Sequence, residues 1–241
     1  MKNILLKVTT VFVTIVLFTS CIGNMFNGVS GNKNVVIKDR KINETFTKIS
    51  VSNGLELYVT QSKTVSLTVE ADENLHELIK TEVENGVLKI YTDKNIWKAK
   101  AKKIHISIKD FNELIATSGS TIYTENTLKL NSLRVVTTSG ANTEITVDTE
   151  SIATVATSGA NLNIMGKTAN HTSSATSGSS INAYNLKSKN TTVNVTSGAN
   201  INIYASENLD AKATSGGDID FKGNPKKITK KTTSGGSISA K

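Results

Sequence analysis

The sequence contains few cysteine, proline, arginine and aromatic residues. It has one cysteine and one proline in 241 residues, so no internal disulfide can form. Only two residues, Arg40 and Arg134, are arginine, and aromatic residues make up 5%. Arginine is the side chain that best recognises phosphates and bases, and aromatic rings stack on unpaired bases. The composition therefore argues against nucleic acid as a partner.

Residues with catalytic potential are equally scarce. The three histidines, His76, His105 and His171, have no spacing that would make a metal-binding pair. Serines are abundant, but none is singled out beside a histidine and a carboxylate, as a catalytic nucleophile would be. We therefore expect no metal, no cofactor and no catalytic residue.

The first residues have the features of a secretory signal. Lys2 and Lys7 are followed by the apolar run VTTVFVTIVLF over residues 8–18 and then by small residues. A run of 11 residues is too short for a membrane span, which needs about 20. We assign residues 1–20 to a signal peptide. Its removal leaves 26 basic and 20 acidic residues, a net charge of +6.

The ending LFTSC resembles a bacterial lipobox, with Phe18 where leucine is more usual. The resemblance implies cleavage before Cys21, lipidation of that cysteine and a membrane anchor in the cell envelope, most simply in the outer membrane. Several acyl chains would hold the protein firmly, since each buried methylene contributes about 0.8 kcal/mol. A plain signal peptide that leaves a cysteine behind is the alternative. The sequence leaves the periplasmic or surface face undecided.

The rest of the chain divides by composition and periodicity. Residues 21–39 are rich in Gly, Asn and Ser and are expected to be a flexible tether. Residues 40–112 alternate as strands do, with Leu55, Leu57 and Val59 on one face. We expect this part to be a strand-rich N-terminal cap.

Local signals place turns and one helix in this cap. Asn53-Gly54 and Asn85-Gly86 precede strands, where turns with positive φ favour these residues. Asp72 is a good helix N-cap, and Leu75, Leu78 and Ile79 would share one helical face. We therefore expect one short helix after Asp72.

From residue 113 to residue 241 a Thr-Ser-Gly triplet recurs seven times. The spacing between successive glycines is 18 to 21 residues, close to the repeat lengths of stacked architectures. The glycines are Gly119, Gly140, Gly159, Gly178, Gly198, Gly216 and Gly235.

Alignment on the glycines shows one strand after each of them. In the third copy Leu162, Asn163 and Ile164 alternate apolar, polar and apolar, and most copies have the same pattern. The sequence therefore predicts an all-β fold, a right-handed parallel β-helix of about seven coils after the cap, continuous with it as one domain. The glycines would form the corners, with the serines facing inward and hydroxyls bonding from coil to coil. A phosphate-binding loop is excluded because no helix follows any of the glycines.

The order of these segments resembles a known family. It runs RKINETFTKISVSNGLELYVTQ, VEADENLHELIKTEVENGVLKIYTD and IHISIKDFNELIATSGS, followed by the Thr-Ser-Gly coils, so it covers roughly residues 40–241. These segments are similar to the head GIN domain family of adhesin-like lipoproteins, found largely in Bacteroidetes. The resemblance implies a β-helix-like body on a lipid anchor, and it brings no catalytic residues.

Polar residues of the outer face are the candidates for ligand binding. Asn161, Asn163, Asn200 and Asn202 would form amide ladders, which hold coils together and can also bind sugar hydroxyls. Beside them lie Asp218 and Asp220, on one face about 7 Å apart. They are either a carboxylate pair for a glycosidic bond or part of a solvated surface.

Two lysine-rich segments complete the list of candidates. The segment KNIWKAKAKK surrounds Trp97 with lysines, and it is either a contact for anionic lipid or glycan, or a hairpin tip. The C-terminal tail contains Pro225 and several lysines, a composition that protects an open sheet edge from association.

The leading hypothesis is a non-catalytic, lipid-anchored envelope protein that acts as an adhesin or glycan-binding module, with the membrane and glycans as partners. A polysaccharide lyase or hydrolase using Asp218 and Asp220 is the first alternative. A purely structural periplasmic lipoprotein is the second.

Overall fold

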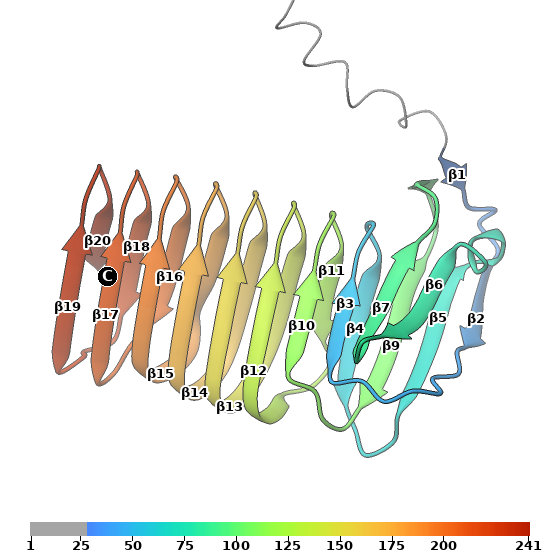
Figure 1. The fold of residues 1–241 in the computed structure, drawn as a ribbon, viewed down its shortest axis with the longest axis horizontal. Helices are drawn as coiled ribbons and strands as arrows, with labels where there is room; N and C mark the ends of the chain where they lie inside the picture. Colours follow the sequence, from blue (N-terminus) through green and yellow to red (C-terminus); the bar gives the residue numbers. More distant parts are fainter. Residues whose placement is uncertain (1–27) are drawn as a thin grey trace, which may run out of the picture.

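The structure, a computed structural model, describes residues 28–241 and consists almost entirely of strands (Figure 1). The expected signal peptide and Cys21 lie outside these residues. The N-terminal strands are β1 (Val29–Ser30), β2 (Val35–Asp39), β3 (Lys48–Val51), β4 (Glu56–Gln61), β5 (Ser66–Asp72), β6 (Ile79–Glu84), β7 (Val87–Thr92), β8 (Ile96–Lys98) and β9 (Lys102–Ile108). Those of the repeats are β10 (Glu113–Ala116), β11 (Thr121–Thr124), β12 (Leu128–Thr137), β13 (Asn142–Ala156), β14 (Asn161–Ala175), β15 (Ser180–Val195), β16 (Asn200–Tyr204), β17 (Asn208–Ala213), β18 (Asp218–Lys222), β19 (Lys227–Thr232) and β20 (Ser237–Ala240).

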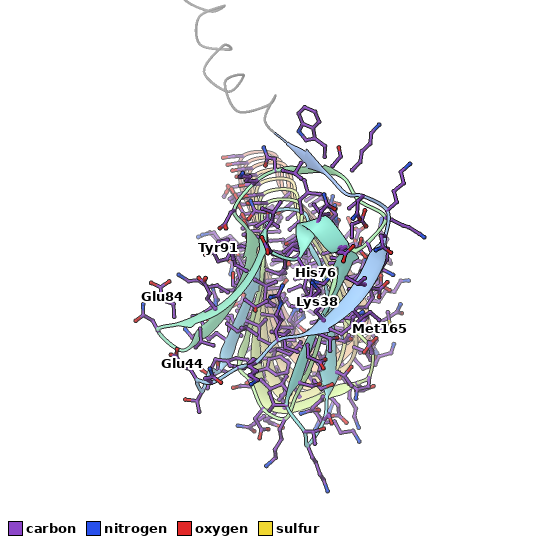
Figure 2. All side chains as sticks on the ribbon, turned by 90° about the vertical axis from the view of Figure 1, so that its right-hand side faces the viewer. Lys38, Glu44, His76, Glu84, Tyr91 and Met165 are labelled. Carbon is purple, nitrogen blue, oxygen red and sulfur yellow. The ribbon has the colours of Figure 1, made fainter. Side chains whose placement is uncertain are left out.

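The repeats wind into a β-solenoid of about seven turns, as predicted. Parallel strands stack into two facing layers, and β13, β14 and β15 each pass from one layer into the other. Layer A contains β7, β3, β10, β12, β17, β19 and the second halves of the three long strands. Layer B contains β9, β4, β11, β16, β18, β20 and their first halves. Figure 2 looks along the stack and shows side chains filling the space between the layers.

Each Thr-Ser-Gly triplet forms a tight turn between the layers. Ser158 and Gly159 both have positive φ, 55° and 69°, and the Ala160 N–H donates to the Thr157 carbonyl at 3.3 Å. This is a type I′ turn, whose two central residues both need positive φ. The Gly159 N–H donates to the Ser177 carbonyl of the next coil at 3.1 Å, so the turns stack as a backbone ladder. All seven predicted glycine corners have this conformation.

The predicted direction of the corner serines was wrong. Ser158 is exposed, and the buried residue is Ala160, after the glycine. Two successive residues with positive φ reverse the chain, so the simple alternation of a strand does not continue through the corner. The hydroxyls mostly face their own neighbours, as Thr157 and Ser158 do at 3.4 Å. In residues 28–241, Thr233 and Thr214 are the one pair of corner hydroxyls bonded between coils.

The solenoid begins inside the cap. Asn53-Gly54 forms an eighth corner with positive φ, and its Gly54 N–H donates to the Ser118 carbonyl at 3.0 Å. The strands on either side, β3 and β4, stack on β10 and β11. Asn85-Gly86 has the same backbone conformation but joins the antiparallel hairpin β6–β7, which projects sideways and bears Glu84 and Tyr91 (Figure 2). Both Asn-Gly turns are thereby confirmed.

The end of the cap departs from the sequence prediction in two places. A 3₁₀ turn, Glu73–Leu75, replaces the expected helix, and Asp72 makes no side-chain capping bond to it. The reason is that the Asp72 carboxylate is occupied by other backbone N–H groups and that Ile79 already begins β6. Val35–Asp39, assigned to the flexible tether, forms β2 antiparallel to β5, because it pairs with the edge of β5 that β9 leaves free.

The core is one continuous cluster from Ile49 to Phe221. Its aliphatic and alanine side chains alternate with more exposed ones along most solenoid strands, which is the predicted pattern, whereas β19 at the open end is exposed throughout. Residues 28–241 contain no helix long and apolar enough to cross a membrane.

Candidate functional site: an outer row of aromatic, amide and acidic side chains

One row of side chains crosses the outer surface of layer B from end to end. The strand registers place its members directly beside one another, at a repeat of about 4.8 Å. We call this set the central row; it consists of His105, Tyr58, Tyr123, Glu144, Asn163, Asn182, Asn202, Asp220 and Ser239. Because the positions alternate along each strand, all of them point away from the core.

The central row begins with a stack of aromatic rings. Tyr58 lies between His105 and Tyr123, with ring centroids 4.9 and 5.2 Å apart and interplanar angles of 17° and 25°. The Tyr58 hydroxyl donates to Glu56 at 3.1 Å. Burial, and then the bond to Glu56, raise the pKa of Tyr58 to about 12, so its hydroxyl stays neutral at physiological pH. The three rings form a continuous stack edged by Glu70 and Glu125, which lie 3.5 and 3.8 Å from the His105 nitrogens.

Exposed amides form the middle of the row. Within the described residues, Asn163, Asn182 and Asn202 make no bonds to one another, although the Asn182 oxygen accepts from the Tyr184 N–H at 3.5 Å. Their remaining donors and acceptors therefore face solvent.

The adjacent row does form the expected contacts between coils. The Asn161 amide donates to Asn142 at 3.2 Å, and Ser180 donates to Asn200 at 2.6 Å. The amide-ladder prediction thus holds for the row that contains Asn161 and Asn200. It fails for the one that contains Asn163 and Asn202, because those side chains do not turn toward each other.

The far end of the row is acidic and carries a further ring. Tyr184 occupies an extra position in β15, where the register between β14 and β15 shifts. Its ring lies under the Lys222 ammonium, 4.3 Å from the centroid. Burial, and then the charges of Asp220 and Asp218, raise the pKa of Tyr184.

The two carboxylates lie on the outer face of β18, and one of them is paired with a lysine. Asp220 pairs with Lys241 at 3.2 Å, and Asp218 is its neighbour along the strand. Residues 28–241 contain no group of three His, Cys, Asp or Glu side chains that could hold a metal ion. The pair is therefore the acidic end of the polar row.

Trp97, the remaining candidate, lies elsewhere. It belongs to β8, which pairs with β1 at the cap end of the molecule, remote from β16 and β18 (Figure 1). The structure thus brings Asn161, Asn163, Asn200, Asn202, Asp218 and Asp220 onto one face and separates Trp97 from it.

Sequence reasoning missed several members of this face. His105 and Tyr58 belong to cap strands without a Thr-Ser-Gly marker, so the repeat alignment does not reach them. Tyr184 is marked by the 20-residue spacing from Gly178 to Gly198, one more than the commonest spacing. A second amide ladder on layer A, Asn170–Asn190–Asn208, has bonds of 3.0 and 2.6 Å and was also missed.

The fold and the row define a class of protein, a β-solenoid with a continuous lateral row of polar and aromatic side chains. Residues 45–225 match the family model described as "Putative auto-transporter adhesin, head GIN domain", so the chain belongs to the head GIN domain family. This confirms the resemblance noted in the sequence, and it makes the protein adhesin-like and points to the cell envelope or surface.

Solved structures of similar fold come from species of Bacteroides and Parabacteroides. A "putative adhesin" of Bacteroides fragilis has a TM-score of 0.82 at 21% identity, over 89% of this chain and 100% of its own. A "putative lipid binding protein" of Parabacteroides distasonis has a TM-score of 0.74 at 22% identity with the same coverage. A "putative adhesin" of Parabacteroides merdae has a TM-score of 0.74 at 18% identity, over 89% of this chain and 99% of its own. The search of curated proteins gave no match.

Proposed function

We propose that this protein is a non-catalytic, lipid-anchored envelope module that binds glycans along the central row. The observation that carries the proposal is the continuity of the Tyr58 ring stack with the amides of Asn163, Asn182 and Asn202 in one register. The outward sides of the stacked rings offer apolar surface to the C–H groups of sugars, while amides donate to and accept from sugar hydroxyls. A repeat of about 4.8 Å offers these groups at regular intervals along an extended polymer.

The charges along the row favour a neutral or cationic glycan. Glu144 and Asp220 lie within it, and Glu56, Glu70 and Glu125 surround the ring stack. A polyanionic uronate chain would be repelled at both ends of the row. Amino sugars with free ammonium groups would be attracted at the same points.

A glycan array with the chain from residue 21, carrying Cys21→Ser, tests this proposal. We expect binding to envelope or host glycans, and a loss of at least about tenfold in Tyr58→Ala/Tyr123→Ala, since stacked aromatic contacts contribute about 1 kcal/mol each or more. Asn163→Ala/Asn202→Ala tests the same face with one exposed and one half-buried amide, which make no bonds to one another. Asn190→Ala/Asn208→Ala, on layer A, is the control for removing two amides elsewhere; because it also breaks the layer A ladder, its melting temperature is compared with that of the wild type. Silence on every glycan, or an equal loss in the control, contradicts the proposal.

Anchoring is tested separately at Cys21. We expect the natural protein to incorporate a labelled fatty acid and to partition with membranes, and Cys21→Ser to do neither. Protease shaving of intact cells then distinguishes an adhesin on the surface from a structural lipoprotein facing the periplasm, since only the former is cleaved. An unlabelled wild-type chain would refute the anchor.

A further inference from the structure

The β1–β8 ribbon presents a compact basic surface around the chain's one tryptophan. Trp97 is 53% exposed, and its indole lies so close to Gly28 that a Cβ on Gly28 would be 2.0 Å from the ring. Lys33, Lys94, Lys98 and Lys100 are exposed nearby, and none of them forms an ion pair within residues 28–241. We call Lys33, Lys94, Trp97, Lys98 and Lys100 the Trp97 edge.

This edge is fixed in place rather than being the tip of a mobile hairpin. The Val29 N–H donates to the Asn95 carbonyl at 2.8 Å, and the Gly31 N–H donates to that of Lys98 at 2.7 Å. The buried carboxylate of Asp72 accepts from the N–H groups of Lys33, Lys100 and Ala101 at 2.8 to 3.0 Å. One carboxylate therefore ties both strands of the edge to the cap.

The edge also lies where the chain leaves the folded body. Six residues lie between Cys21 and Gly28, so the seven residue steps reach at most about 25 Å when fully extended. Residues 1–27 contain no acidic side chain that would neutralise the lysines. If Cys21 is at a membrane surface, Trp97, which packs against Gly28, lies within reach of the same surface.

We propose that the Trp97 edge docks on the anionic headgroups of the bilayer to which Cys21 is anchored. The proposal rests on the anchoring given under Proposed function. Trp97 inserts at the interface, where an amphipathic indole is most stable, and the lysines pair with lipid phosphates. The docked edge orients the solenoid so that its cap faces the membrane and layer B remains accessible to glycans.

The core cluster runs from Ile49 to Phe221, so it is contained in the folded residues 28–241. The chain from residue 21 with Cys21→Ser is therefore suitable for vesicle binding. Because Trp97 is the one tryptophan, its fluorescence reports on this edge alone. With phosphatidylglycerol vesicles we expect a blue shift, quenching by brominated acyl chains and loss of binding at high salt. With phosphatidylcholine vesicles we expect no shift.

Lysine variants at the two ends of the molecule give a matched comparison. Lys94→Gln/Lys98→Gln/Lys100→Gln should reduce partitioning on the order of 100-fold, since each lysine near an anionic surface contributes about 1 kcal/mol. Lys226→Gln/Lys227→Gln/Lys231→Gln removes the same charge at the opposite, C-terminal end and should retain the wild-type affinity (Figure 1). All six lysines are exposed, so both variants should keep the wild-type melting temperature.

Three outcomes would overturn the docking proposal. The first is a Trp97 fluorescence spectrum that does not change on anionic vesicles. The second is an equal loss of vesicle affinity in the two triple-lysine variants. The third is a Lys94→Gln/Lys98→Gln/Lys100→Gln variant that loses glycan binding but keeps vesicle binding. Failure of glycan binding on the array leaves this vesicle result unaffected. An unlabelled Cys21 would refute the anchor itself, so the failures of the two proposals are distinguishable.

Discussion

At the scale of single residues, the corner glycines and a buried histidine set the stability of the solenoid. At Gly159 a Cβ would meet no atom within 4 Å, so the backbone conformation is what restricts this position. Its φ of 69° is costly for side chains other than those of glycine and asparagine, and most costly for β-branched ones.

Gly159→Val should therefore lower the free energy of unfolding by about 1–3 kcal/mol, the usual cost of such backbone strain. Gly159→Asn should lower the free energy of unfolding much less, because asparagine tolerates positive φ, as Asn53 does in the Asn53-Gly54 corner. Urea unfolding of both variants measures the difference. Equal losses would show that space rather than conformation restricts the corner.

His171 makes the core sensitive to acid. Its Nε2 lies 2.9 Å from the Thr154 hydroxyl, its Nδ1 has no partner, and burial lowers the pKa of His171 to about 4. Since the unfolded pKa is near 6.5, the unfolded chain binds more protons between pH 6.5 and 4. The contribution of neutral His171 to the free energy of unfolding is therefore complete above pH 6.5 and is lost as the pH falls toward 4.

We expect wild-type stability to decrease by roughly 2–3 kcal/mol from this residue between pH 7 and pH 4.5. His171→Thr, which copies Thr191 in the next coil, should remove that part of the decrease. The variant should still lose some stability in acid, because burial also lowers the pKa of His76. Urea unfolding at the two pH values measures the effect, and an unchanged pH dependence in His171→Thr would contradict it.

At the scale of elements, Asp72 holds the Trp97 edge onto the cap. Burial alone would raise the pKa of Asp72, but the N–H groups of Ala101, Lys33 and Lys100 outweigh it and lower the pKa. Asp72→Ala leaves these three buried or half-buried donors without an acceptor. The expected loss is about 2–4 kcal/mol, since hydrogen bonds to a charged group contribute about 1.5–3 kcal/mol each and are not additive.

Hydrogen exchange should locate this loss at Lys33, Lys100 and Ala101. Asp93→Ala is the control, because Asp93 forms only an exposed pair with Lys80 at 3.3 Å, a type of contact that contributes at most about 1 kcal/mol. Equal effects of the two substitutions would mean that the Asp72 bonds do not fix the edge.

The elements also show what a sequence can and cannot predict here. The coils were predictable because the same apolar and polar alternation returns after each glycine, as in Leu162–Ile164. The orientation of Ser158 was not, because alternation fails across two residues with positive φ. The antiparallel partners β2 and β5 lie far from the repeats, and nothing local to Val35–Asp39 indicates the pairing. The amides of the candidate face were predictable because they recur at the same position of the Thr-Ser-Gly repeats. The ring stack was not, because His105 and Tyr58 lie in cap strands outside those repeats.

At the scale of the whole molecule, the solenoid has a covered end and an open end. Antiparallel β2 and β5 cover the N-terminal end, whereas β19 and β20 are the last strands at the other (Figure 1). Lys230 occupies an inner-row position, beside Ala211, and its ammonium lies 4.5 Å from the centre of the Phe221 ring. An inward charge at an open edge prevents a second molecule from continuing the stack.

Lys230→Val should therefore promote end-to-end self-association, because it completes an apolar row at an unpaired edge. Lys231→Val, on the outer side of the same strand, should leave the protein monomeric. Light scattering across a concentration series distinguishes the two. A monomeric Lys230→Val would show that the edge is protected by other means.

The central claim is that one lateral face of this solenoid is a glycan-binding surface. The most direct measurement is the affinity for the strongest array ligand, by titration calorimetry, in the wild type, in Asn163→Ala/Asn202→Ala and in Asn190→Ala/Asn208→Ala. We predict a Kd raised at least about tenfold by the central-row pair and unchanged by the layer A pair, a difference of about 1.4 kcal/mol or more. Equal Kd values in all three proteins would contradict the claim.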